Sequence, residues 1–169
     1  WPNADAAVWF AHDVLPRVLE SRPDARFYIV GMNPSPTVSR LAIDPNVIVT
    51  GRVPDVRPYL QHAAVVVAPL RVARGIQSKI LEAMAMARPV VTTPTAAQSI
   101  RGRLGTDLDS AADADAYAQK VLRLMGSPAG SDMGKAARVR VVAEYNWERN
   151  LTAYDGLLRA ATPATGMAG

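Results

Sequence analysis

The feature that most constrains this chain is a series of short, almost wholly apolar runs separated by segments of helical periodicity. These runs lie at 27–31, 46–51, 64–70 and 89–93, and one more short strand is expected at 104–108. Strands that are apolar on both faces and alternate with helices are typical of a parallel sheet covered by helices on both sides. We therefore expect an α/β fold, in which the valine-rich run at 64–70 is too apolar to be half-exposed.

Helical periodicity occurs between and after these runs. Residues 3–20 carry an apolar stripe, with Asn3 as the expected N-cap and Pro16 marking a kink or the last turns. The other expected helices lie at 37–41, 56–62, 76–87, 111–125, 132–145 and 147–161. Residues 162–169 are rich in small side chains and are expected to form a flexible tail. A chain of 169 residues suits one domain, here 1–161.

Composition excludes several kinds of chemistry. The chain has no Cys, so it has no disulfide framework, thiolate nucleophile or cysteine zinc site. Its two histidines, His12 and His62, are far apart in the sequence, and no Ser, His and Asp grouping indicates a hydrolase triad. Neither a Walker loop nor a GxGxxG motif is present. We expect no metal site and no cofactor.

Positive charge is concentrated in the middle of the sequence. Residues 52–103 carry eight basic and two acidic side chains, whereas the rest of the chain carries eleven basic and thirteen acidic ones. Such a window fits either a general polyanion binder or a single pocket for a small phosphorylated ligand. We do not expect nucleic-acid binding, because no recognition motif accompanies the charge.

The sequence contains no apolar run near the roughly 20 residues needed to cross a bilayer, and it shows no secretory signal. We therefore expect a cytoplasmic location. The first residue is Trp1 rather than Met, and we expect the chain to be a piece of a longer protein.

Ligands of parallel α/β sheets bind beyond the carboxyl ends of the strands. The loops expected there are 31–36, 51–55, 70–75 and 93–99. The third is the most informative, because a basic loop with Arg71 and Arg74 leads through Gly75 into a helix that carries Lys79. A helix start offers unpaired N–H groups and a partial positive charge, so it is suited to an anion.

Glu82 lies on the same helix among Leu81 and an Ala-Met-Ala-Met run. A carboxylate in apolar surroundings needs a partner, and the paired hydroxyls of a sugar or ribose could supply one. The simpler interpretation is that Glu82 pairs with Lys79 on a solvated face, with Gly75 a plain turn residue and Arg71 and Arg74 solvated loop charges. Both interpretations stay open from the residues alone.

At this point the chain resembles the GT-B glycosyltransferases of the large group often called family 4. The resemblance rests on Leu-Glu-Ala-Met-Ala at 81–85, Arg-Pro-Val-Val at 88–91, the Gly-x-Val loop at 51–55, and the closing elements at 133–138 and 145–148. It covers roughly residues 27–161. A subset of these enzymes, the exopolysaccharide/PEP-CTERM-associated sugar transferases, carries a similar Arg-Gly-x-Gln-x-Lys-x-Leu-Glu-Ala-Met pattern, and this chain is expected to resemble that subset most.

The resemblance implies a Rossmann-like, donor-binding C-terminal half of a two-domain enzyme that lacks its N-terminal acceptor domain. The donor would be a UDP- or GDP-sugar, transferred with retention to a saccharide or lipid-linked acceptor, and the full-length enzyme could associate peripherally with the inner face of the membrane. The implied donor-binding residues are Arg52, Val53, Arg74, Gly75, Ile76, Gln77, Ser78, Lys79 and Glu82; no catalytic residue is implied.

The chain departs from the family pattern in two places. Arg74 stands where the first Glu of the Glu-x7-Glu motif usually contacts the donor sugar. The family domain also opens with a strand and a Gly-containing loop, whereas this chain begins in the helix that follows, so the first strand is expected to be missing. A non-catalytic nucleotide-binding or partner-docking module of the same fold is therefore the alternative, and the piece alone is expected to be inactive.

Overall fold

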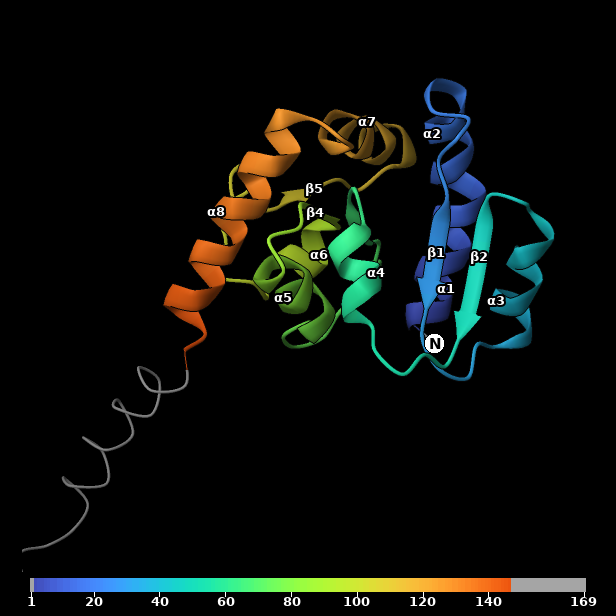
Figure 1. Cartoon of the computed structure of the whole chain (residues 1–169), viewed down its shortest axis with the longest axis horizontal. Coiled ribbons are helices and arrows are strands. Elements are labelled where there is room, and N and C mark those ends of the chain that lie inside the picture. Colours follow the sequence, from blue (N-terminus) through green and yellow to red (C-terminus); the bar gives the residue numbers. More distant parts are fainter. Residues whose placement is uncertain (1, 147–169) are drawn as a thin grey trace, which may run out of the picture.

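The computed structural model describes residues 2–146, which form short parallel strands and the helices that cover them (Figure 1). Strand β1, Phe27–Val30, pairs with β2, Val47–Gly51. Strands β3, Val66–Ala68, β4, Val90–Thr92, and β5, Asp109–Ser110, pair in that order in a second sheet. The expected α/β class with parallel strands is confirmed.

The first helical run extends from Pro2 to Ser21. It consists of α1, Pro2–Trp9, a π-helical turn, Phe10–Val14, and α2, Leu15–Ser21. Pro16 has no N–H to donate toward His12, so the regular hydrogen-bond ladder is interrupted where the π turn lies. The later helices are α3, Pro36–Arg40, a 3-10 turn, Leu41–Ile43, α4, Arg57–His62, α5, Ser78–Ala85, α6, Pro94–Ala97, α7, Ala114–Leu124, and α8, Pro128–Glu144.

The division into two sheets differs from the single sheet that we expected. Within residues 2–146, no strand pairs with the second edge of β1 or of β3. All of β4 is buried, but β1 and β3 are partly exposed, and Tyr28 is 52% exposed. The run at 64–70, expected to be too apolar for half-exposure, is buried at 68–70 and partly buried at Val66 and Val67, which lie beside an unpaired edge.

One apolar core joins the two sheets through the first helical run. The ring of Phe10 lies 4.5 Å from that of Phe27 in β1 and 6.0 Å from that of Tyr117 in α7. Val67 of β3 packs against the same cluster. The hydroxyl of Tyr117, which is fully buried, donates to the carbonyl of Val91 in β4 at 2.5 Å. The two sheets thus share a helix layer although no strand of one pairs with a strand of the other.

Several element ends also differ from the expectation. The fifth strand lies at Asp109–Ser110 instead of 104–108, because the earlier segment curls into a turn in which Leu104 and Leu108 form only an isolated bridge. Helix α1 starts at Pro2, so Asn3 lies inside the first turn and is not the N-cap. Helix α8 starts at Pro128, four positions before the expected 132, because Ser127 caps it and proline suits the first helical position.

The remaining differences are small or untested. Helix α5 is shorter than the expected 76–87, since Gln77 is its N-cap and Ala87, with φ of 54°, cannot continue it. The short helix α6 occupies part of the loop expected at 93–99. The helix expected at 147–161 and the tail expected at 162–169 lie outside the described residues.

Two buried carboxylates, at and just before β5, hold helices α7 and α8 against the second sheet. Asp107 accepts hydrogen bonds from Arg103 at 3.2 Å and from Arg140 of α8 at 3.0 Å. Asp109 of β5 pairs with Lys120 at 2.5 Å and Arg123 at 2.8 Å, both on α7. Burial acts to raise the pKa of each carboxyl, but the hydrogen bonds from these cations outweigh it, so both pKa values lie below the usual range.

We predict that Gly134→Ala strongly destabilises the protein. A Cβ at this position on α8 would lie 2.1 Å from the carbonyl oxygen of Ala87, so α8 or the turn before β4 must shift. The free energy of unfolding should fall by about 2–4 kcal/mol in urea denaturation. Val139→Ala, on the exposed face of the same helix, should change it by less than about 0.5 kcal/mol. Equal effects of the two substitutions would contradict the packing described.

We also predict acid sensitivity from Asp107. Since its folded pKa lies below the unfolded value, its contribution to stability is present above about pH 4 and is lost as the pH falls through the folded pKa. Asp107→Asn should cost about 2–3 kcal/mol at neutral pH and should flatten the fall in unfolding free energy between about pH 5 and 2. The exposed Asp132→Asn variant should retain the wild-type pH profile.

Candidate functional site

The carboxyl end of β3 is fixed by two buried threonines, Thr92 at the end of β4 and Thr93 directly after it. The hydroxyl of Thr92 donates to the carbonyl of Ala68 at 2.8 Å, and that of Thr93 donates to the carbonyl of Leu70 at 2.5 Å. Because both acceptors lie where the chain leaves β3, these bonds set the point from which the basic loop starts. The loop therefore extends from a rigid base.

The loop ends at a helix start that no side chain caps. Gly75, with φ of 66°, adopts the left-handed conformation that glycine accommodates without strain. Gln77 is the N-cap of α5, but its side-chain amide donates backwards to the carbonyls of Arg74 and Gly75 at 3.1 and 3.2 Å. The side chains of Ser35, Thr93, Asp113 and Ser127, in contrast, cap α3, α6, α7 and α8.

An uncapped start leaves the first N–H groups of α5 available to a ligand. Those N–H groups and the helix dipole favour a negative charge at this point. Arg74 and Lys79 add full positive charges on either side of the start. The side chain of Arg74 makes no hydrogen bond or ion pair with the described residues. The arrangement can therefore bind an anion such as a phosphate or diphosphate.

The first turns of α1 lie against this loop and hold two of its basic side chains. Nζ of Lys79 donates to Oδ1 of Asn3 at 2.5 Å. Arg71 forms a two-pronged ion pair with Asp5, in which Nε lies 3.0 Å from Oδ2. The hydrogen bond from Arg71 lowers the pKa of the Asp5 carboxyl. Desolvation lowers the pKa of the Lys79 ammonium group, while the nearby charge of Glu82 acts to raise it.

These segments enclose a pocket of about 450 Å³ at the carboxyl end of β3. Its lining consists of Pro2, Asn3, Leu70, Val72, Ala73, Arg74 and Gln77. The walls are thus partly apolar and partly basic, and they come from α1 on one side and the loop on the other. A ligand with a flat or apolar part and a negative charge fits such a lining.

Glu82 matches neither interpretation of the sequence in full. It is exposed, so it lies on a solvated face as the simpler interpretation has it and not in apolar surroundings. It forms no ion pair with Lys79 among the described residues, since Nζ of Lys79 donates to Asn3. Among the residues that the structure describes, its carboxylate accepts no hydrogen bond. It lies one helical turn after the uncapped start and is free to accept hydroxyl groups of a ligand.

The structure brings together only some of the residues expected in the site. Arg74 and Gln77 line the pocket. Lys79 does not line it but donates a hydrogen bond to Asn3, which does. The side chains of Ile76 and Ser78 are exposed beside it. Arg52 and Val53, which follow β2 in the other sheet, are not part of the pocket lining.

Asn3 and Asp5 were missed by sequence reasoning. Asn3 was interpreted as a helix cap, and Asp5 is an ordinary acidic residue in the first turn of a helix. A usable signal was present, since a helix that precedes a parallel strand begins at the carboxyl edge of the sheet, beside the basic loop. The sequence does not show that these two side chains meet Lys79 and Arg71 rather than solvent.

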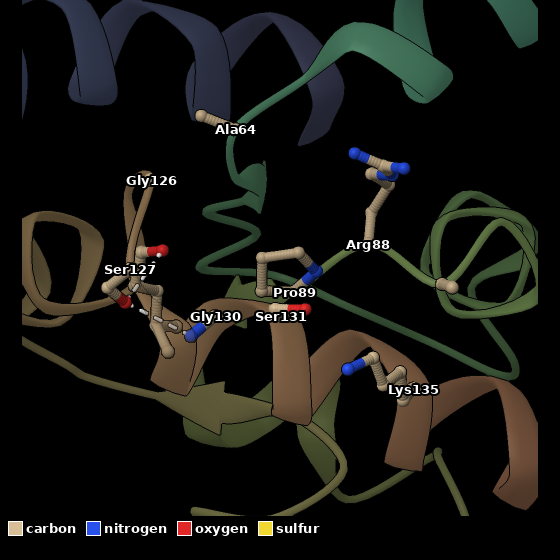
Figure 2. Close-up of a pocket in the computed structure, with 10 residues that line it drawn as sticks. Ala64, Arg88, Pro89, Gly126, Ser127, Gly130, Ser131 and Lys135 are labelled. Atoms are coloured by element: carbon tan, nitrogen blue, oxygen red, sulfur yellow. Dashed lines mark hydrogen bonds between the residues drawn. The ribbon is translucent and has the colours of Figure 1, made fainter.

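A second pocket, of about 460 Å³, lies at the opposite, amino end of β3 and β4 (Figure 2). Ala64 precedes β3, Arg88 and Pro89 precede β4, and Ser127 and Lys135 belong to the cap and body of α8. Ser127 already accepts a hydrogen bond from the N–H of Gly130, and Arg88 donates to the carbonyl of Met86. Ser127 and Arg88 are thus already engaged, whereas the uncapped start of α5 and the side chain of Arg74 lie at the other end, so we assign the candidate site to the carboxyl end.

Two further observations concern residues 2–146 alone. No cluster of three or more His, Cys, Asp and Glu side chains there could hold a metal ion. No helix in this part of the chain is both long and apolar enough to cross a bilayer.

Two solved structures show which fold this chain has. HepE of Anabaena in complex with UDP and glucose superposes with a TM-score of 0.72 at 14% identity, over 86% of this chain and 44% of that one. S. aureus TarM, in a complex that contains UDP, gives 0.73 at 20% identity over 90% of this chain and 32% of its own length. The fold is therefore that of one half of a GT-B glycosyltransferase.

Sequence comparison identifies the family. The family model described as "Glycosyl transferases group 1" matches residues 1–127, and the chain belongs to this family. It is 31% identical over 148 residues to a GDP-mannose-dependent monoacylated alpha-(1-6)-phosphatidylinositol monomannoside mannosyltransferase of Corynebacterium glutamicum. That match covers 79% of this chain and 39% of the relative. The chain thus spans less than half the length of the relatives named here.

We predict that Asp5 and Arg71 are energetically coupled. Because Arg71 is half exposed, a double-mutant cycle with Asp5→Asn and Arg71→Gln should give a coupling of only about 0.5 kcal/mol in unfolding free energy. Salt should weaken it. The same cycle between Asp5 and Arg74 should give no coupling, and a coupling of equal size there would contradict the pairing described.

Proposed function

We propose that this chain is the donor-binding half of a glycosyltransferase and holds a nucleoside-diphosphate sugar at the start of α5. The observation that carries the proposal is the uncapped helix start between Arg74 and Lys79, with the unpaired Glu82 one turn further on. The relatives support the ligand class, since two contain UDP and one is named for GDP-mannose. They differ in the base, so a UDP- and a GDP-sugar are both candidates.

Each part of the site has a physical role in this proposal. The N–H groups of Gln77, Ser78 and Lys79 and the charge of Lys79 would hold the diphosphate, with Gly75 allowing it close to the backbone. Glu82 would accept hydrogen bonds from the two ribose hydroxyls. As the family resemblance implies, Arg52 and Val53 would border the base and Ile76 would lie beside the diphosphate.

The transfer that we propose breaks the bond between the sugar C1 and the diphosphate oxygen, whose electron pair leaves with the diphosphate. It forms a bond from C1 to an acceptor oxygen, whose proton passes to the leaving diphosphate. Negative charge would develop on the leaving diphosphate, where the α5 dipole, Lys79 and Arg74 would stabilise it. We also propose that the acceptor binds to a separate N-terminal domain and that the reaction takes place between that domain and this one. This chain alone would then transfer no sugar. No catalytic residue is assigned.

The finer predictions rest on the family resemblance. They are retention of configuration, a saccharide or lipid-linked acceptor, a role in polysaccharide or exopolysaccharide synthesis, similarity to the exopolysaccharide-export subset, and a cytoplasmic location with the full-length enzyme at the inner face of the membrane. All of them stay predictions.

Arg74 favours one alternative function. It takes the position of the acidic residue that contacts the donor sugar in relatives, and a module that binds nucleotide without transferring a sugar would not need that contact. Full-length protein that binds UDP or GDP but neither transfers nor hydrolyses any sugar across a panel of donors would favour this alternative.

We predict that UDP or GDP binds this chain and that Glu82→Ala weakens the affinity about tenfold, since two charge-assisted hydrogen bonds to the ribose are lost. Lys79→Gln should weaken it by a similar factor and should reduce the dependence on salt. Isothermal titration calorimetry with both nucleotides measures these changes.

Glu20→Ala is the matched control, because Glu20 is also an exposed acidic residue on a helix, at the end of α2 away from the pocket. It should leave the affinity unchanged. Equal affinities of wild type and Glu82→Ala would remove Glu82 from the site, and absence of binding to either nucleotide would contradict the proposed function.

A further inference from the structure

Asn3 both lines the pocket and contacts Lys79. It lies in the first turn of α1, across the pocket from the basic loop that ends at Gly75. Its Oδ1 accepts a hydrogen bond from Nζ of Lys79 at 2.5 Å. This contact holds the lysine beside the start of α5, but it involves only one half of the side-chain amide.

The chemistry of the pair fixes which way round the amide lies. A lysine ammonium group carries three donors and no acceptor, so the oxygen of Asn3, and not the nitrogen, faces Nζ of Lys79. Nδ2 is therefore turned away from the lysine. Within residues 2–146, Nδ2 donates no hydrogen bond. Because Asn3 lines the pocket whereas Lys79 does not, two N–H donors remain for a ligand there.

The groups around Nδ2 favour an acceptor with negative charge. Arg74 and Gln77 line the same pocket, and no carboxylate does. The nearby Asp5 is engaged with Arg71. A ligand atom that accepts from Nδ2 thus lies among donors and a positive charge. A phosphate oxygen accepts several hydrogen bonds at once, and each bond to a charged oxygen is stronger than one to a neutral acceptor.

We propose that Asn3 acts twice at the donor site: its Oδ1 positions Lys79, and its Nδ2 donates to a diphosphate oxygen of the nucleotide. This inference rests on the proposed function. The diphosphate is then held from both sides of the pocket, by α5 and Lys79 on one side and by α1 on the other. Because Asn3 is a neutral partner, Lys79 keeps its charge for the ligand.

Two substitutions separate the positioning of Lys79 from the hydrogen bond to the ligand. An aspartate at position 3 can still hold Lys79, through an ion pair, but its second oxygen is an acceptor and brings negative charge toward the diphosphate. An alanine removes the positioning and the donor without adding a charge. If Asn3 only positioned Lys79, Asn3→Asp would therefore be the milder change. If Nδ2 donates to the diphosphate, Asn3→Asp is the more severe one.

Calorimetric titration of this chain with UDP and GDP tests the proposal. We expect Asn3→Ala to weaken the affinity about fivefold and Asn3→Asp to weaken it about fiftyfold, since the aspartate adds charge repulsion to the lost donor. Higher salt should narrow the gap between the two variants, because exposed charges are screened. The unliganded variants should melt close to the wild-type temperature, since Asn3 is exposed.

Asn46→Asp is the matched control. Oδ1 of Asn46 also accepts from a cation, Nη1 of Arg26 at 2.6 Å, but this pair lies just before β2, at the amino end of the other sheet. The substitution makes the same change of charge away from the pocket and should leave the affinity unchanged. As a direct readout, the Nδ2 proton resonances of Asn3 should move downfield when UDP is added, and those of Asn46 should not.

Three results would overturn the proposal, and they are distinguishable. Binding of UDP by Asn3→Asp that is no weaker than binding by Asn3→Ala would show that Nδ2 does not donate to the diphosphate. An effect of Asn3→Asp on a UDP-sugar but not on UDP would place the amide against the sugar instead. A wild-type chain that binds neither nucleotide would overturn the proposed function and this inference together, whereas the first two results leave the proposed function standing.

Discussion

The packing of one helical run against two separate sheets is the interaction on which the rest of the structure depends. No strand joins β1–β2 to β3–β5 within residues 2–146, so the apolar core around the first helical run, with the aromatic contacts of Phe10 to Phe27 and Tyr117, makes the connection. Apolar burial is roughly proportional to area and has no direction. Apolar burial therefore holds the two sheets together, while the hydrogen bonds within each sheet set the register and direction of its strands.

The same helical run also builds the candidate site. Because its first turn begins at the carboxyl end of β3, Asn3 and Asp5 meet Lys79 and Arg71. Two basic side chains are thereby held in place, whereas Arg74 and the N–H groups of α5 remain available. The site therefore depends on residues that are far apart in the sequence and meet only after the core has formed.

Much of the fold could be predicted from the sequence, because apolar runs and helical periodicity are local signals. They located four of the five strands and the helix that follows Gly75. They did not show that β1 and β3 have unpaired edges, since an apolar run is the same whether its neighbour is present or not. The strand at Asp109–Ser110 was misplaced because its position depends on Asp107, which pairs with Arg140 on a distant helix.

The candidate site could also be predicted only in part. The basic loop and the helix start could be predicted from residues 71–79. The positive charge of the loop and the N–H groups of the helix start belong to these residues themselves and do not depend on distant ones. The environment of Glu82 was not, since the apolar neighbours in its sequence lie on the other face of α5. Which side chains line the pocket depends on α1, whose role no local pattern indicated.

The central claim is that a nucleotide binds at the start of α5, at the carboxyl end of β3. Mapping of amide chemical shifts during a UDP or GDP titration of the isotopically labelled chain tests it most directly. We predict that the largest changes occur at Gln77, Ser78 and Lys79, and at Asn3 through its bond to Lys79. Changes confined to the second pocket, around Ser127 and Ser131, would contradict the account.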